Sequence, residues 1–83
     1  MSDQFINKVI RSLKDHGLTE ARYVGRARDR RCDRDGMRLE KFRGFKDGVP
    51  WVAYACPEPK CHHVHMKNLA LMRRILIELP EGL

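Results

Sequence analysis

The sequence predicts an α+β domain built as helix, three-stranded antiparallel meander, helix, with both helices on one face of the sheet. Three observations predict this fold. Apolar residues recur at helical spacing near both ends of the chain, segments rich in β-branched and aromatic residues lie between them, and turn residues separate these segments. At 83 residues the chain is expected to form one domain, residues 1–83.

The first expected element is an amphipathic helix over residues 3–16. Ser2 or Asp3 can cap its N-terminus, and Gly17 suits the left-handed position that follows the last helical turn. The apolar residues on one face of this helix are Phe5, Ile6, Val9, Ile10 and Leu13. Charged side chains occupy the opposite face, so the helix is expected to pack on the sheet through the apolar one.

Three strands are expected next, over about residues 21–30, 37–45 and 49–56. The polar stretch 31–36 ends in Asp-Gly, which favours a hairpin, and residues 46–48 are typical of a tight turn. Two successive hairpins predict an antiparallel meander.

The last expected element is a second helix from about Met66 to Leu79, preceded by an irregular loop at residues 57–60 and ended by Pro80. Its apolar stripe consists of Leu69, Leu71, Met72, Ile75, Leu76 and Leu79. The resulting order of elements resembles that of double-stranded RNA-binding domains and of small toxin ribonucleases. The glycine–serine–histidine strand motif of those toxins is not found here, so the similarity is one of element order alone.

The positive charge of the chain is concentrated in residues 21–46. Ten basic and four acidic side chains lie there, so this segment alone carries the net charge of +6. A charge asymmetry of this kind predicts a polyanionic partner or an acidic protein surface.

Arginines of the first strand and the loop after it are the candidate nucleic-acid contacts. The strand arginines are expected to share one face. The candidates are Arg22, Arg26, Arg28, Arg30, Arg31 and Arg34. The planar guanidinium group binds phosphate through two parallel hydrogen bonds, which favours RNA or DNA as the partner. Tyr23, Phe42 and Trp51 could stack on bases, although the core is the more common place for them.

Two other functions stay open. Asp29, Asp33 and Asp35 interrupt the basic run and weaken the nucleic-acid interpretation. A protein–protein regulator or inhibitor of the kind made by phages or mobile elements, docking on an acidic surface, is therefore the main alternative. A histidine-dependent ribonuclease is the third, but no positioned acid partner accompanies the histidines, so no catalytic residue is assigned.

A cluster of cysteines and histidines predicts a zinc site. Two thiols and three imidazoles lie between Cys56 and His65, and Cys32 lies in the first hairpin loop. In a meander the ends of the first and third strands lie at the same end of the sheet, about 10 Å apart. Cys32, Cys56 and Cys61 are thus expected to converge, with His63, or else His62 or His65, as fourth ligand. A site without metal, with Cys56 as a small apolar core residue, remains the alternative.

The composition also predicts where the protein works. No apolar run approaches the roughly 18 residues that a membrane span requires, and the first residues lack the layout of a signal peptide. A cytoplasmic protein without a membrane partner is expected. Three cysteines, an odd number, argue against a disulfide framework.

Overall fold

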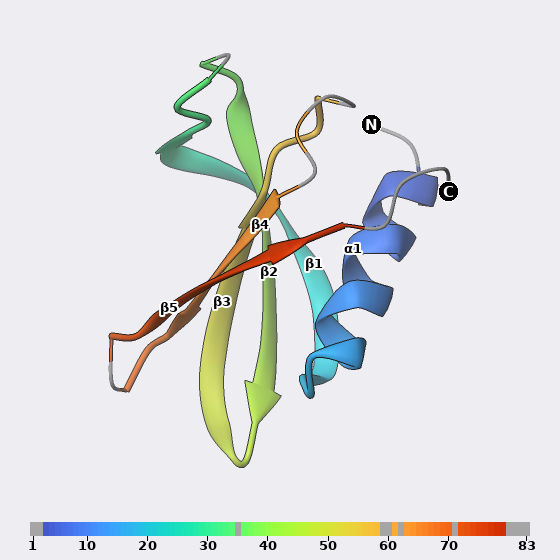
Figure 1. Ribbon diagram of the computed structural model, residues 1–83, viewed down its shortest axis with the longest axis vertical. Coiled ribbons are helices and arrows are strands. Elements are labelled where there is room, and N and C mark those ends of the chain that lie inside the picture. The colour runs from blue at the N-terminus through green and yellow to red at the C-terminus, as the bar shows by residue number, and fades with distance from the viewer. Residues whose placement is uncertain (1–2, 35, 59–60, 62, 71, 80–83) are drawn as a thin grey trace.

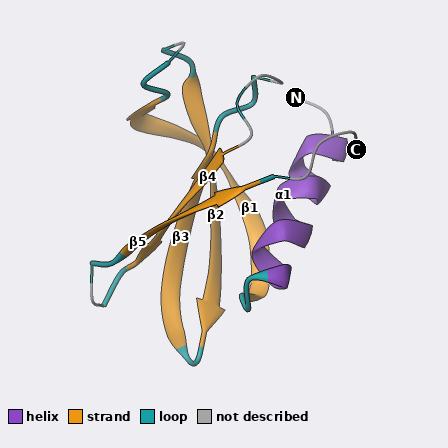
Figure 2. Ribbon diagram, viewed as in Figure 1, coloured by secondary structure: helices purple, strands orange, loops and turns teal. Residues whose placement is uncertain are grey.

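The structure, a computed structural model, describes residues 3–34, 36–58, 61, 63–70 and 72–79. One helix precedes a five-stranded antiparallel sheet in which each strand pairs with the next along the chain (Figures 1 and 2). The elements are α1 (Asp3–Asp15), β1 (Thr19–Arg31), β2 (Arg38–Lys46), β3 (Val49–Ala55), β4 (His63–Asn68) and β5 (Arg74–Glu78). Figure 1 shows a strongly twisted sheet with α1 lying alongside β1.

The predicted first helix is confirmed. Val9 and Leu13 lie one turn apart on its apolar face, and both are fully buried. Gly17 takes the left-handed conformation, with φ of 92°. The amide of Gly17 donates a hydrogen bond to the carbonyl of Lys14, and the amide of Leu18 donates one to the carbonyl of Leu13. These two carbonyls of the last helical turn thereby gain hydrogen-bond partners. Within the described part of the chain, no helix is long and apolar enough to cross a lipid bilayer.

The three predicted strands are confirmed as β1, β2 and β3. The connection between β2 and β3 is the two-residue turn Asp47-Gly48, and both residues have positive φ, 54° and 76°. Such a turn has the twist of the strands that it joins, and glycine and aspartate are among the few residues that accept it. The tight turn expected at this position is thus also confirmed.

The predicted second helix is wrong. The segment from Met66 to Leu79 completes β4, turns, and returns as β5. At the turn, the side-chain oxygen of Asn68 accepts a hydrogen bond from the amide of Ala70 (2.9 Å), and the amide of Asn68 donates to the carbonyl of Arg73 (2.8 Å). The described residues therefore form one helix and five strands, and their order of elements is not that of the double-stranded RNA-binding domains.

Burial along β4 explains why a strand forms there. Val64, Met66 and Asn68 are buried, whereas His65 is exposed and Lys67 is half-buried. This alternation has the two-residue period of a strand with one face on the core. Because β4 supplies the hydrogen bonds that the outer edge of β3 needs, and β5 does the same for β4, pairing prevails over the helix propensity of the leucines and arginines.

The main core lies between α1 and one face of the sheet, here called the helix face. Residues opposite one another in the register share a face, as Phe42, Ala53 and Met66 do. The buried members of this core, the helix cluster, are Val9, Leu13, Leu18, Phe42, Trp51, Ala53, Ala55, Val64, Met66, Ile77 and Leu79. The other face, the open face, contains the row Lys41, Tyr54 and His65.

Gly44 of β2 lies close to Leu18 and Thr19, where the segment that follows α1 enters β1. A Cβ atom at this position would lie 2.9 Å from Cδ2 of Leu18 and 3.2 Å from the carbonyl oxygen of Thr19. Both distances are shorter than ordinary van der Waals contacts. Only glycine allows the sheet and this linking segment to pack at their observed separation.

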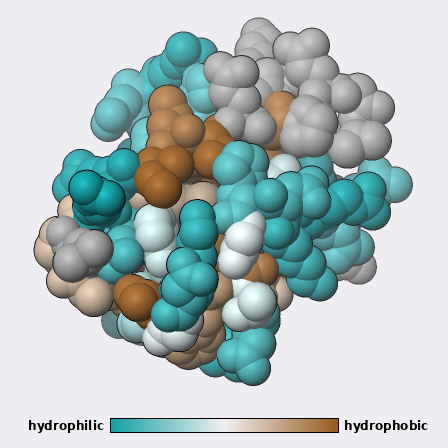
Figure 3. Space-filling view, turned by 60° about the horizontal axis from the view of Figure 1, so that its bottom comes forward, coloured by the Kyte–Doolittle hydropathy of each residue, from teal (hydrophilic) through white to brown (hydrophobic). Residues whose placement is uncertain are grey.

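Large apolar side chains also occur at the surface. The exposed ones are Val24, Met37, Phe45, Leu69, Met72, Ile75 and Leu76. The view in Figure 3 shows hydrophobic residues as patches within broader hydrophilic areas. The hydrophilic areas are consistent with a chain in which 34% of the residues are charged.

Candidate metal centre and cationic sheet face

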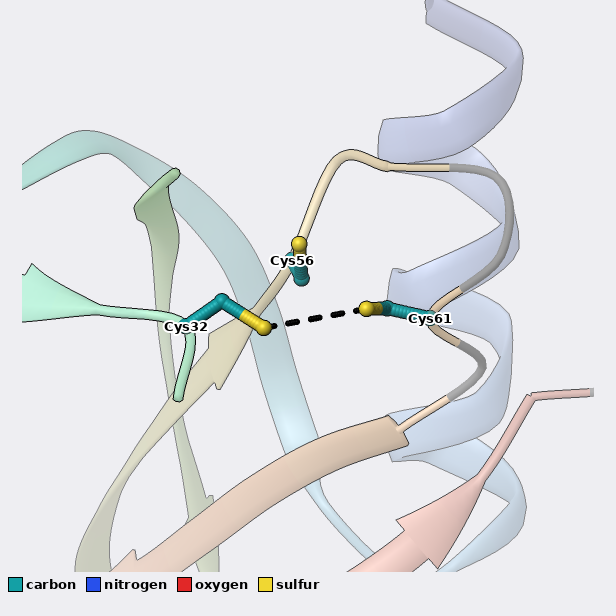
Figure 4. A group of neighbouring side chains, drawn as sticks. All are labelled: Cys32, Cys56 and Cys61. Carbon is teal, nitrogen blue, oxygen red and sulfur yellow. Dashed lines mark hydrogen bonds between the residues drawn. The ribbon is translucent and has the colours of Figure 1, made fainter. Parts of the chain in front are cut away.

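The three cysteines come together at one end of the sheet, as the meander predicts. Their sulfur atoms all lie within 4.8 Å of one another. The Sγ atoms of Cys32 and Cys61 face each other at 3.7 Å, with Cys56 beside them (Figure 4). None of the three cysteines forms a disulfide, whose bond would require about 2.05 Å.

Each cysteine is positioned by a different segment. Cys32 opens the loop after β1, where its carbonyl accepts a hydrogen bond from the amide of Gly36 (2.9 Å). Cys56 directly follows β3. Cys61 lies before β4, and its amide donates to the carbonyl of Glu58 (2.9 Å), which brings the chain back toward Cys56. The backbone of these three segments thus brings the three short cysteine side chains together.

A small apolar group surrounds the thiols. Leu39, Cys56 and Cys61 are buried together, and Cys32 and Tyr54 pack against them half-buried. We call these five residues the thiol cluster. It is separate from the helix cluster, and Tyr54 connects it to the open face of the sheet.

The sulfur separations are compatible with a metal ion. Zinc binds thiolates at about 2.3 Å, so two sulfur ligands of a tetrahedral site lie about 3.8 Å apart. The 3.7 Å between Cys32 and Cys61 matches this edge, and Cys56 is close enough to complete a three-sulfur face. Three thiolates favour soft or borderline metals such as zinc over calcium or magnesium. The three cysteines could therefore hold a metal.

The predicted fourth ligand, His63, lies outside this sulfur group but lines the same cavity as the cysteines. Its Nδ1 atom is buried and has no hydrogen-bond partner within the described residues. Ala55 pairs with Val64, so His63 is next to the end of β3, where Cys56 follows. His65 lines the cavity as well. The alternative ligand His62 lies outside the described residues.

The candidate nucleic-acid contacts are all exposed, but they do not share one face. The six residues are Arg22, Arg26, Arg28, Arg30, Arg31 and Arg34. Arg22 pairs with Arg43 on the open face, whereas Arg26 pairs with Glu40 on the helix face. Between these pairs the register shifts by one residue next to Gly25, whose φ is 119°. Such a bulge reverses the alternation of side chains, so the expectation of a single arginine face is wrong.

Arg26 is engaged by a buried carboxylate. Glu40 is fully buried, its Oε2 accepts a hydrogen bond from the Tyr23 hydroxyl at 2.7 Å, and its Oε1 accepts one from Nε of Arg26 at 3.3 Å. Burial, the hydrogen bond to Glu40 and the charge of Glu40 together raise the pKa of Tyr23, and Arg26 opposes them. The ring of Tyr23 also packs against that of Phe42 in a tilted arrangement, with ring centroids 5.4 Å apart and an interplanar angle of 57°.

Two predicted stacking residues are core residues. Phe42 and Trp51 are buried in the helix cluster, and Tyr23 is hydrogen-bonded beside it. Tyr54 was not among the expected site residues, yet it lies on the open face with two cations over its ring. The guanidinium carbon of Arg30 lies 5.4 Å from the ring centroid, and Nζ of Lys41 lies 6.0 Å from it.

The sequence contains a signal for Tyr54. Trp51, Ala53 and Ala55 alternate with Val52 and Tyr54 along β3, so the tyrosine is on the opposite face from the tryptophan. The open-face residues of β4 and β5 could not be found in the same way, because the pattern of their segment predicts a helix and not alternating strand faces.

These features describe a chain with a thiol cluster at one end of the sheet and a cationic open face beside it. Comparisons with protein-family models, with curated proteins and with solved structures gave no match. The function must therefore be inferred from the chemistry of the site.

Proposed function

We propose that this chain is a small nucleic-acid-binding module in which a zinc ion holds one end of the sheet. The ligands would be Cys32, Cys56, Cys61 and His63. The observation that carries the proposal is the convergence of three sulfur atoms from three separate segments, within 4.8 Å of one another. One of these segments is the loop that continues the arginine-rich strand β1.

The stability of a small domain supports a role for metal. A chain of this length buries only about 60% of the surface that its unfolded form exposes. The thiol cluster contains far fewer apolar residues than the helix cluster, so burial of apolar surface contributes little to the stability of the loops at this end of the sheet. Zinc would connect these loops, and its binding free energy would be available only to the folded chain.

The metal and the basic residues would act together. Arg31 and Arg34 line the same cavity as Cys32 and Cys61, so a metal bound there would fix the loop that presents both arginines. A preordered cationic loop loses less conformational entropy when it binds a phosphate backbone. Zinc would thus contribute to affinity without contacting the nucleic acid.

Salt dependence is the sharpest test of nucleic-acid binding. We expect a fluorescein-labelled oligonucleotide to bind in an anisotropy titration, with affinity that falls steeply between about 50 and 200 mM salt. Arg28→Ala and Arg34→Ala should each lower the slope of log affinity against log salt by about one. Lys14→Ala, which removes an exposed charge from α1, is the matched control and should leave the slope unchanged.

Two outcomes would oppose the proposal. Absence of binding at low salt would contradict it directly. Binding to polyglutamate with no binding to any oligonucleotide would instead favour the alternative partner, an acidic protein surface. Chelation should weaken oligonucleotide binding, because it releases the loop that carries Arg31 and Arg34.

A further inference from the structure

We infer that the nucleic acid lies across the open face of the sheet and is a single, unpaired strand, with Tyr54 as its stacking platform. The inference rests on the proposed function and specifies the surface and the class of nucleic acid. It draws on residues of β2 to β5 that lie outside the arginine-rich strand, among them Lys41, Lys67 and Arg74.

Like charges are paired across strands on this face. Arg22 lies directly opposite Arg43 between β1 and β2, and Lys67 lies directly opposite Arg74 between β4 and β5. Like charges in directly opposite positions destabilise a sheet. The ion pair found within the described residues, Arg26 with Glu40, involves the helix face and does not neutralise them. A polyanion on the open face would offset this repulsion.

The open face is hollowed beside Tyr54. Arg30, Tyr54, His65, Lys67 and Arg74 line one concavity, to which β1, β3, β4 and β5 all contribute. One carboxylate, that of Asp33, also lines it. Cations on opposite sides of a hollow can contact successive phosphates of one strand, whereas cations on a convex surface diverge.

Tyr54 favours an unpaired strand over a duplex. Its ring is half-buried and packs against the other residues of the thiol cluster, and the guanidinium group of Arg30 and the ammonium group of Lys41 lie over it. A tyrosine ring or a guanidinium plane can stack on a base only when the base is not stacked within a helix. A duplex would present its phosphates to the cations and leave the ring without a partner.

A second aromatic residue extends the same face. Phe45 is 39% exposed. It lies on the same face as Lys41 and Arg43, because the three residues occupy every second position of β2. Aromatic and cationic side chains therefore follow one another across the open face from Tyr54 to Phe45. This is the arrangement by which proteins bind single strands without strict sequence preference.

The test is an anisotropy titration of the full chain with labelled oligothymidylate and oligouridylate of about 12 nucleotides, and with a duplex of equal length. We expect both single strands to bind at least about tenfold more tightly than the duplex. Tyr54→Leu should weaken single-strand binding about 5- to 140-fold, which corresponds to one stacked base. Tyr54→Phe, which keeps the ring, should bind within about twofold of the original chain.

Two cations of the open face, the half-buried Lys67 and the exposed Arg74, provide variants that do not depend on the thiol cluster. Lys67→Glu and Arg74→Glu should weaken binding more than Lys14→Glu on α1, without lowering the melting temperature, because each turns a like-charge cross-strand pair into an opposite-charge pair. These two variants remain informative if Tyr54→Leu proves unstable.

The outcomes separate this inference from the proposed function. Equal affinity for duplex and single strand, with no loss in Tyr54→Leu, Lys67→Glu or Arg74→Glu, would overturn the open-face site while nucleic-acid binding stands. Failure of every oligonucleotide to bind would overturn both. A preference between oligothymidylate and oligouridylate, which differ in the sugar and in the C5 methyl group of the base, would show which strand the face prefers and would support the inference in either case.

Discussion

The helix cluster and the thiol cluster are both apolar and buried, but they are built differently. In the helix cluster, α1 covers one face of the sheet, and large side chains such as Phe42, Leu13 and Met66 are fully enclosed. In the thiol cluster, the buried residues are Leu39 of β2 and two cysteines from the connection between β3 and β4, and Cys32 and Tyr54 pack against them half-buried. The first cluster contains many buried apolar side chains and the second contains few, so burial stabilises the first more, and under the proposed function a metal would stabilise the second.

This difference assigns separate roles to the two regions. The helix cluster holds the sheet, and we expect substitutions there to lower stability whether or not metal is present. The thiol cluster holds the loops and the tyrosine beside the cationic face, so its changes should affect stability and binding together.

Removal of metal should produce the largest change. If free zinc exceeds its dissociation constant 100- to 1,000-fold, its binding adds about 3–4 kcal/mol to the free energy of unfolding. For a domain of this size, chelation should lower the melting temperature by about 12–30 °C, measured by circular dichroism, and added zinc should restore it. The Cys56→Ser chain should have a lower melting temperature than the original chain, and chelator should not change it further. Equal melting temperatures with and without chelator would count against the metal.

Leu13→Ala should destabilise the helix cluster. The side chain is fully buried, so its truncation leaves a cavity and should cost about 2–5 kcal/mol in a urea titration. The same loss is expected with zinc and with chelator, because distant sites act additively. Leu69→Ala, at a position 46% exposed, is the control and should change stability by less than about 0.5 kcal/mol. A loss that depends on zinc would contradict the separation of the clusters.

Gly44→Ala should cost about 1–3 kcal/mol, because the added methyl group meets Leu18 at 2.9 Å. The collision predicts coupling. In a Leu18→Ala background, which removes the colliding methyl group, the same change at Gly44 should cost measurably less. If the free-energy effects of the two substitutions were additive, contact with Leu18 would not be the cause of the cost of Gly44→Ala.

Tyr23→Phe should give the smallest effect, about 1.5 kcal/mol, from loss of the hydrogen bond to Glu40. Its pH dependence is diagnostic. The pKa of Tyr23 is raised in the folded chain, so this hydrogen bond contributes fully below pH of about 10, the ordinary value, and is lost as pH rises through the folded pKa. Between pH of about 9 and 11 the Tyr23→Phe chain should therefore lose stability less steeply. Parallel pH profiles would contradict this assignment.

Local sequence signals predict much of the fold. The spacing from Phe5 to Leu13, the left-handed Gly17 and the Asp47-Gly48 turn each determine a conformation within a few residues. The convergence of the cysteines follows as well, because a meander places alternate strand ends together. These features need no knowledge of distant parts of the chain.

The predictions that are wrong concern segments whose conformation depends on contacts with distant parts of the chain. The residues of β5 have apolar side chains at spacings that suit either a helix or a strand, and β4 selects the strand by pairing with them. The bulge beside Gly25 moves Arg26 to the helix face, where Glu40 pairs with it. Gly25, a glycine within a strand, is a signal for the bulge, but it does not give the shift in register. The pairing of β4 with β5 has no such local signal, so the cationic open face could not be anticipated.

Metal stoichiometry tests the central claim most directly. Native mass spectrometry of the chain, produced with zinc present, should show one bound zinc ion that chelation removes. Cys32→Ser, Cys56→Ser and Cys61→Ser should each lose or strongly weaken this binding, and Lys14→Ala should retain it. A metal-free mass for the original chain, with an unchanged melting temperature after chelation, would contradict the proposed zinc site.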